Sequence, residues 1–121
     1  MSKKLSILPL EDIVDSIDAI FSFIEAMEET TFLEDRKTKD AVARNFEIIG
    51  EATNRIPESL KMKYSHSEWH KAVGLRNRII LGYDGVNYSQ VWNTIHQSLP
   101  IYKNQILSII SDPNFQQYYY L

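Results

Sequence analysis

The chain has 121 residues, 44% hydrophobic and 24% charged, which fits one globular domain with its own core. It has no cysteine, which excludes disulfides and thiolate metal sites and favours a reducing cytoplasm. A net charge of -3 argues against holding nucleic acid by bulk positive charge, but it allows a small basic cleft. No apolar run approaches the ~20 residues of a membrane span, so no membrane association is expected.

Apolar residues recur at spacings of three and four along most of the chain, which predicts helices. The first helix is expected over about residues 10–27, with Pro9 in its first turn. The second is expected over residues 35–55, where Ile56-Pro57 ends it. A short helix is predicted over residues 58–62.

The second half of the chain predicts two further helical stretches. Ser65 and Glu68 have the spacing of a capping box, which predicts a third long helix over about residues 67–80. Residues 82–85 are expected to form a loop. A fourth helix begins near residue 87 or 88, and Pro100 is expected to kink it or to split it in two.

Together these elements predict an all-α fold, an antiparallel bundle of four long helices plus a short one. No segment shows the period-two alternation of a strand. We expect one helical domain over residues 1–112. Residues 113–121 form a tyrosine-rich C-terminal tail without a clear period.

Arg76 is the first candidate site residue, because its neighbours in the third helix are mostly apolar. It could form a structural ion pair with Glu47 or Glu51 on the second helix, which from position and composition is the commoner arrangement. Alternatively, its guanidinium could clamp a phosphate, since it stays charged and binds two phosphate oxygens at once. Arg78 lies about 160° further round an ideal helix, so it should face solvent or an interface instead.

Asn77 and Tyr83 lie close to Arg76 in the sequence. Asn77 could end the helix, bind a substrate or orient Arg76. Tyr83 could be a half-buried aromatic residue, the commoner case for a lone tyrosine. It could also contact a substrate or accept a modification.

The segment of residues 74–83 resembles the motif of the HepT-like toxins among the HEPN ribonucleases. That motif is Arg, four residues, His, one residue, Tyr, and here it reads Arg76, Leu81 and Tyr83. The resemblance covers about residues 33–110. It also rests on residues 32–42, 48–52, 55–57 and 82–88, and on Trp69 and Val91-Trp92.

This resemblance implies a homodimer of helical bundles that cuts RNA without a metal or other cofactor. It implies the toxin half of a type VII-like toxin–antitoxin pair. The antitoxin would be a minimal nucleotidyltransferase (MntA-like) that AMPylates the motif tyrosine. By the same resemblance Arg76 is the phosphate-binding catalytic residue, Asn77 supports the site, and Tyr83 is the AMP acceptor.

Leu81 departs from the family motif, because it stands where the motif has histidine. Metal-free RNA cleavage needs a proton carrier, and general acid–base help is worth ~10²–10⁴ in rate. Leucine exchanges no proton. His70 lies about 240° round an ideal helix from Arg76, His66 is near the helix start and His96 is on the fourth helix, so we expect none of them to replace the missing histidine. The three also form no cluster with metal-ligand spacing. We therefore expect little or no RNase activity.

Several alternatives stay open at this stage. The chain could be an active endoribonuclease that lacks the usual histidine, or a catalytically dead helical module that binds protein or RNA. Leu81 could be native or an inactivating replacement. Without the resemblance, the pattern describes a four-helix interaction domain in which Arg76 serves stability alone.

Overall fold

The computed structural model describes residues 7–81 and 85–116, and these residues fold into helices without a strand. The all-α prediction is therefore confirmed. The elements are α1 (Ile7–Phe23), α2 (Glu29–Glu34), α3 (Arg36–Arg55), α4 (Glu58–Lys63), α5 (Trp69–Leu81), α6 (Tyr88–Gln97), α7 (Leu99–Ser111) and α8 (Pro113–Phe115).

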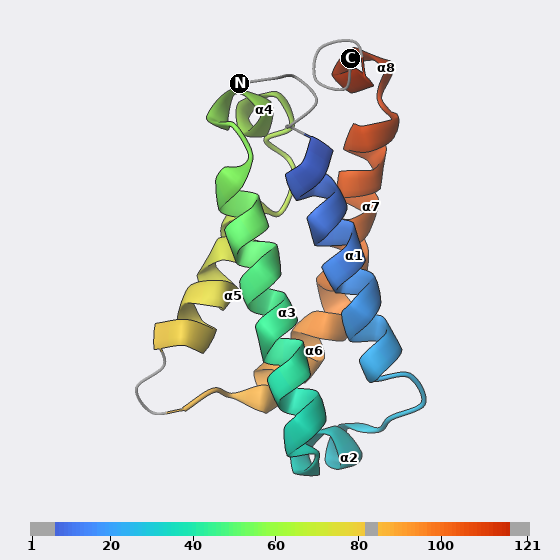
Figure 1. The fold of residues 1–121 in the computed structure, drawn as a ribbon, viewed down its shortest axis with the longest axis vertical. Coiled ribbons are helices and arrows are strands. Elements are labelled where there is room, and N and C mark those ends of the chain that lie inside the picture. Colours follow the sequence, from blue (N-terminus) through green and yellow to red (C-terminus); the bar gives the residue numbers. More distant parts are fainter. Residues whose placement is uncertain (1–6, 82–84, 117–121) are drawn as a thin grey trace.

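The central helix is α3, which packs against α1 on one side and α5 on the other (Figure 1). The chain direction reverses from α3 to α5, so the two helices are antiparallel. Helix α7 lies beside α1, while α4 and α8 lie at one end of the bundle and α2 at the other. An exposed ion pair of 2.8 Å between Arg55 and Asp12 also links α3 to α1.

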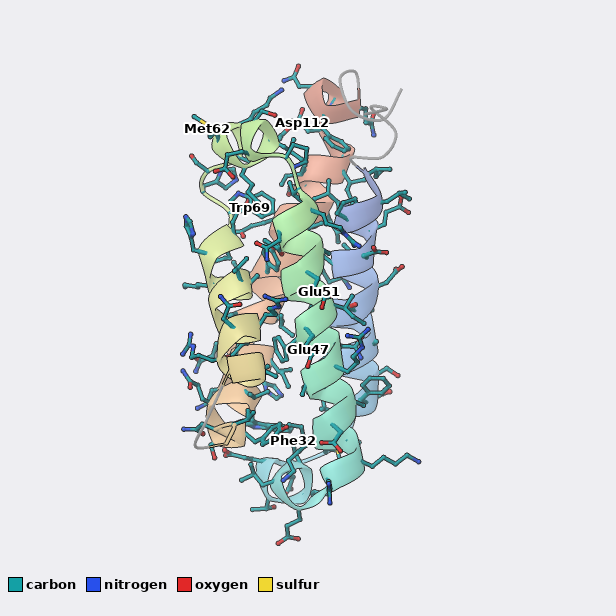
Figure 2. All side chains as sticks on the ribbon, turned by 60° about the vertical axis from the view of Figure 1, so that its left-hand side comes forward. Phe32, Glu47, Glu51, Met62, Trp69 and Asp112 are labelled. Carbon is teal, nitrogen blue, oxygen red and sulfur yellow. The ribbon has the colours of Figure 1, made fainter. Side chains whose placement is uncertain are left out.

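Each helix contributes apolar side chains to one core, which explains why short elements such as α2 and α8 stay attached. Buried examples, one from each helix in chain order, are Ile13, Phe32, Phe46, Leu60, Leu75, Val91, Ile106 and Phe115. Figure 2 shows side chains in the space between the helices, with Phe32 near one end of the bundle and Trp69 nearer the other. A buried pair of hydroxyls, Thr53 on α3 and Tyr102 on α7, adds a 2.8 Å hydrogen bond.

Two predicted boundaries are confirmed. Asp35 caps α3, because its carboxylate accepts hydrogen bonds from the backbone N–H and the hydroxyl of Thr38, and these lower the pKa of Asp35. Pro100 splits the last helical stretch, and it lies in the first turn of α7, where its missing N–H costs no helical hydrogen bond.

Two other boundaries were wrong. Helix α1 ends at Phe23 rather than near residue 27, because Ala26 has a φ of 62° and turns the chain out of the helix. The capping box of Ser65 and Glu68 does not form. The backbone N–H of Glu68 donates instead to Gln105 on α7, at 2.9 Å, and α5 begins at Trp69.

None of the helices described in the structure is long and apolar enough to cross a membrane.

Candidate functional site

Arg76 lies on the face of α5 that packs against α3. Its aliphatic stem lies directly over Gly50, and a Cβ atom added there would be 2.5 Å from Cγ of Arg76, 3.2 Å from Cδ, and closer still to Cβ. Because real Cβ atoms essentially never approach another atom so closely, only glycine fits at position 50 without a shift of the helices. The sequence of α3 thus lets the arginine stem lie flat against the α3 backbone.

The guanidinium of Arg76 is held within its own helix. Its Nη1 donates a 3.0 Å hydrogen bond to Oδ1 of Asn77. Its Nε is buried and has no hydrogen-bond partner. An arginine carries five N–H donors, so most of the donor capacity of this half-buried side chain is not used within the described part of the chain. A charged group left in this state can bind an anion.

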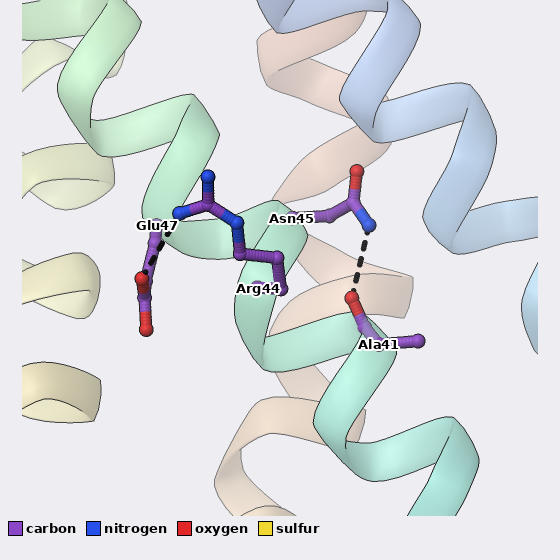
Figure 3. Close-up of polar contacts among 4 residues, drawn as sticks. All are labelled: Ala41, Arg44, Asn45 and Glu47. Carbon is purple, nitrogen blue, oxygen red and sulfur yellow. Dashed lines mark hydrogen bonds and ion pairs between the residues drawn. The ribbon is translucent and has the colours of Figure 1, made fainter.

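The expected ion pair between Arg76 and a carboxylate of α3 does not form. Figure 2 shows Glu47 and Glu51 on α3, one helical turn apart. Glu47 pairs instead with Arg44, at 3.3 Å on the same helix (Figure 3). Neither carboxylate comes within 4.0 Å of Arg76, so the structural ion-pair interpretation of Arg76 was wrong.

Arg78 lies apart from this arrangement. It is exposed and lines a cavity of about 200 Å³ whose other walls include Leu75, Leu99 and Tyr102, whereas Arg76 does not line it. This agrees with the prediction that the two arginines face different directions and do not share a site within one chain.

The remaining motif positions are less fully described. Leu81 is the last residue of α5, so it belongs to the same helix as Arg76 and Asn77. Its side chain is outside the described part of the structure. Tyr83 lies entirely outside the described residues. Arg76 and Asn77 are therefore the two site residues that the structure brings together, and the roles of Leu81 and Tyr83 stay predictions.

The three histidines have no contact with Arg76 through a hydrogen bond or an ion pair. His96 on α6 directs Nδ1 at the carbonyl oxygen of Trp92, at 2.8 Å, and its ring lies 4.5 Å from the ring of Trp92. Because a carbonyl only accepts hydrogen bonds, Nδ1 carries the proton in this contact. His70 and His66 are exposed. Within residues 7–81 and 85–116, no cluster of histidine and carboxylate side chains could hold a metal.

Gly50 contributes to the site, although no prediction from the sequence gave it a role there. A glycine inside a helix costs roughly 1 kcal/mol relative to alanine, so an interior glycine can mark a close approach by another group. The sequence offers two such glycines, Gly50 and Gly74, and only the packing of α5 on α3 shows that Gly50 meets Arg76 while Gly74 meets nothing.

Comparison with known proteins identifies a family. The family described as Ribonuclease HepT-like matches residues 13–109. A Methanocaldococcus jannaschii protein provisionally named RNase MJ1216 is 37% identical over 103 residues, which cover 85% of either chain. A Thermococcus cleftensis protein named as a probable ribonuclease HepT is 35% identical over 96 residues, which cover 79% of this chain and 87% of the relative. No solved structure gives a significant match.

The match with the family spans most of the bundle, including α3, α5 and the Arg76 segment. A third relative, from Caldanaerobacter subterraneus and provisionally named RNase TTE0752, is 31% identical over 101 residues, 84% of this chain and 90% of the relative. The chain belongs to the HepT-like ribonuclease family.

Proposed function

We propose that this chain is a toxin-side subunit of the HepT type that holds an RNA phosphate with Arg76 and cleaves RNA poorly or not at all. The observation that carries the proposal is the guanidinium of Arg76, which is hydrogen-bonded to Asn77 and has no carboxylate partner among residues 7–81 and 85–116. A guanidinium in this state can donate to two phosphate oxygens of an RNA backbone.

Leu81 limits the chemistry of such a site. Cleavage without a metal requires the ribose 2′-oxygen to lose a proton as it attacks phosphorus, and the leaving oxygen to gain one. Arg76 can stabilise the charge of the pentavalent phosphorane, but it does not exchange protons near neutral pH. Leucine cannot supply this step, and His96 uses Nδ1 in a contact on its own helix. We therefore expect the chain to bind RNA but to cleave it poorly or not at all.

The proposal includes a partner and an assembly. It places the chain in the cytoplasm as a homodimer, in which two copies of Arg76 double a basic cleft on an acidic body. A minimal nucleotidyltransferase antitoxin would transfer AMP from ATP to the hydroxyl of Tyr83 and release pyrophosphate. Support for this part comes from family membership and from Tyr83 in its motif position.

The second candidate function is a catalytically dead helical module that binds a protein partner rather than RNA. Leu81 favours it, because a chain without the proton carrier for cleavage has no need to bind RNA as a substrate. Both candidates predict the same fold, and they differ in whether Arg76 is needed for RNA binding.

Fluorescence anisotropy with a labelled 2′-O-methyl RNA tests the proposal, because this RNA cannot be cut through its 2′-oxygen. We expect Arg76→Ala to weaken binding roughly tenfold or more, the value of a charge-assisted hydrogen bond. Arg78→Ala is the matched control, since it removes the same charge two residues away, and it should change binding much less. No effect of either variant would favour the protein-binding module, and equal losses in both would overturn a specific role of Arg76, because RNA would then be held by general positive charge.

The partner is tested separately. The purified chain is mixed with a nucleotidyltransferase of the antitoxin type and ATP, and intact mass is then measured. We expect the chain to gain the mass of one AMP, and Tyr83→Phe to gain none. AMP on the Tyr83→Phe variant, or no AMP on either the parent chain or the variant, would refute Tyr83 as the acceptor.

A further inference from the structure

Gly50 is an unfavourable residue for its place in helix α3. It lies in the interior of the 20-residue helix α3, where glycine is less stable than alanine by roughly 1 kcal/mol. Its φ is in the ordinary helical range, so the backbone conformation does not require glycine. What requires glycine is space, because the Cβ, Cγ and Cδ atoms of Arg76 occupy the volume that a side chain at position 50 would need.

This contact decides how Arg76 is held. The stem lies against the α3 backbone, and Nε is shut away from solvent without a partner. At the far end, Nη1 is fixed by Asn77. The stem of Arg76 is thus placed by Gly50 on α3, and one donor of its guanidinium is bound by Asn77 on α5. The direction of the remaining donors therefore depends on the depth at which the stem rests on Gly50.

Gly74 shows that the requirement is specific to position 50. It is also a helical glycine, on α5 two residues before Arg76, but a Cβ atom added there would meet nothing within 4 Å. The same substitution, glycine to alanine, therefore produces a clash with Arg76 at one position and none at the other.

We infer that Gly50 is a positioning residue for Arg76, which sets the depth of the guanidinium so that its remaining donors face a phosphodiester. This inference rests on the proposed function of Arg76. Any side chain at position 50 pushes the stem of Arg76 away from α3. The donors then move away from the place where they bind phosphate, although the charge of the arginine is unchanged.

The test compares Gly50→Ala, Gly74→Ala and Arg76→Ala in the full chain, with binding of the labelled 2′-O-methyl RNA as the readout. We expect Gly50→Ala to weaken binding roughly tenfold, approaching the effect of Arg76→Ala. Gly74→Ala should bind as the parent does. Parent-like binding by Gly50→Ala, with a loss in Arg76→Ala, would overturn the role of Gly50 and leave the proposed function intact. No loss in Arg76→Ala would overturn both.

A double-mutant cycle separates positioning from general damage. Arg76→Gly removes the atoms that clash, so alanine at position 50 should then fit. We expect Gly50→Ala to lower the melting temperature in the parent and to have little effect or raise it in the Arg76→Gly background. RNA binding should stay lost in the double variant, because the guanidinium is absent. Equal destabilisation in both backgrounds would overturn the steric coupling.

If Gly50→Ala does not fold, NMR of the parent protein tests whether the stem of Arg76 is held against Gly50. The Nε–H proton of Arg76 should exchange with water more slowly by NMR than that of Arg36, which is almost fully exposed. Exchange as fast as that of Arg36 would show that the stem is not held against Gly50 and would overturn the inference.

Discussion

Arg76 and Asn77 are adjacent on α5, and the amide oxygen of Asn77 accepts a 3.0 Å hydrogen bond from Nη1 of Arg76. A neutral acceptor orients the guanidinium without neutralising it, whereas a carboxylate in the same place would compete with a phosphate for it. The choice of asparagine at position 77 therefore keeps the positive charge available.

This relationship predicts different effects for two substitutions of Asn77. Asn77→Ala removes the orienting contact and should weaken RNA binding a few-fold, in line with about 1 kcal/mol for a hydrogen bond. Asn77→Asp should weaken it more, because the new carboxylate pairs with Arg76 and repels phosphate. Anisotropy titrations measure both. Tighter or unchanged binding by Asn77→Asp would contradict the role given to Asn77.

Arg76 should lower the stability of the fold that carries it. Its buried Nε lacks a partner, and a buried unsatisfied donor costs roughly 1–3 kcal/mol. Arg76→Met keeps a linear stem against Gly50 and removes that donor, so we expect a gain on the order of 1 kcal/mol in the free energy of unfolding, together with loss of RNA binding.

Arg55→Met is the control for the same substitution. It breaks an exposed ion pair with Asp12 and should cost between about 0 and 1 kcal/mol. Urea unfolding measures both variants. A clear loss of stability in Arg76→Met would show that Arg76 is primarily structural.

For the buried hydroxyl pair of Thr53 and Tyr102, we predict that removing one hydroxyl costs more stability than removing the other. Thr53 donates its single hydroxyl proton to the carbonyl oxygen of Ile49, so Tyr102 is the donor in the 2.8 Å bond between them. Burial raises the pKa of Tyr102, and the hydroxyl stays protonated. Tyr102→Phe should cost about 1 kcal/mol, because Thr53 keeps its other bond.

Thr53→Val should cost more, roughly 1–3 kcal/mol, because it leaves the hydroxyl of Tyr102 buried without an acceptor. Thermal unfolding of the two single variants and the double variant measures the difference. The order would be contradicted if Tyr102→Phe proved the more destabilising of the two.

Asp112 at the end of α7 predicts a pH effect. The hydroxyl of Tyr64 donates to its carboxylate at 2.7 Å, and the backbone N–H of Asn114 donates at 2.9 Å. These bonds lower the pKa of Asp112 below 3.8. Since the folded pKa lies below the unfolded one, the stabilisation is complete above 3.8 and is lost as the pH falls through the folded pKa.

Tyr64→Phe should therefore raise the pKa of Asp112 toward its ordinary value, as carboxyl ¹³C NMR titration would show. The stability difference between parent and variant should be largest near neutral pH and should narrow below 3.8. Asp35 also has a lowered pKa. Its contribution to the pH dependence cancels in the stability difference, because both proteins retain it. A difference that does not change with pH would refute the account.

Local signals in the sequence sufficed for much of the fold. The apolar period of residues 35–55 predicted α3 to within one residue, and Pro100 predicted the break between α6 and α7, because helical periodicity and proline effects are local. The capping box of Ser65 failed for the opposite reason. The acceptor for the N–H of Glu68 comes from Gln105, 37 residues away, which no local pattern indicates.

The candidate site shows the same division. The sequence indicated Arg76 and Asn77 through a motif, but it could not choose between an ion pair with Glu47 and an unpaired guanidinium. That choice depends on how α5 packs on α3. In the folded structure Glu47 forms an ion pair with Arg44, and the stem of Arg76 lies against Gly50. Helix packing of this kind is set by the whole core, not by neighbouring residues.

The most direct test of the central claim is RNA cleavage without added metal by this chain, by Leu81→His, and by Leu81→His combined with Arg76→Ala. We predict that only Leu81→His cuts, faster than this chain by ~10²–10⁴, the usual worth of a general acid–base group. Removing Arg76 should abolish that gain. Cleavage by this chain as fast as by Leu81→His, and dependent on Arg76, would contradict the claim that Leu81 silences the site.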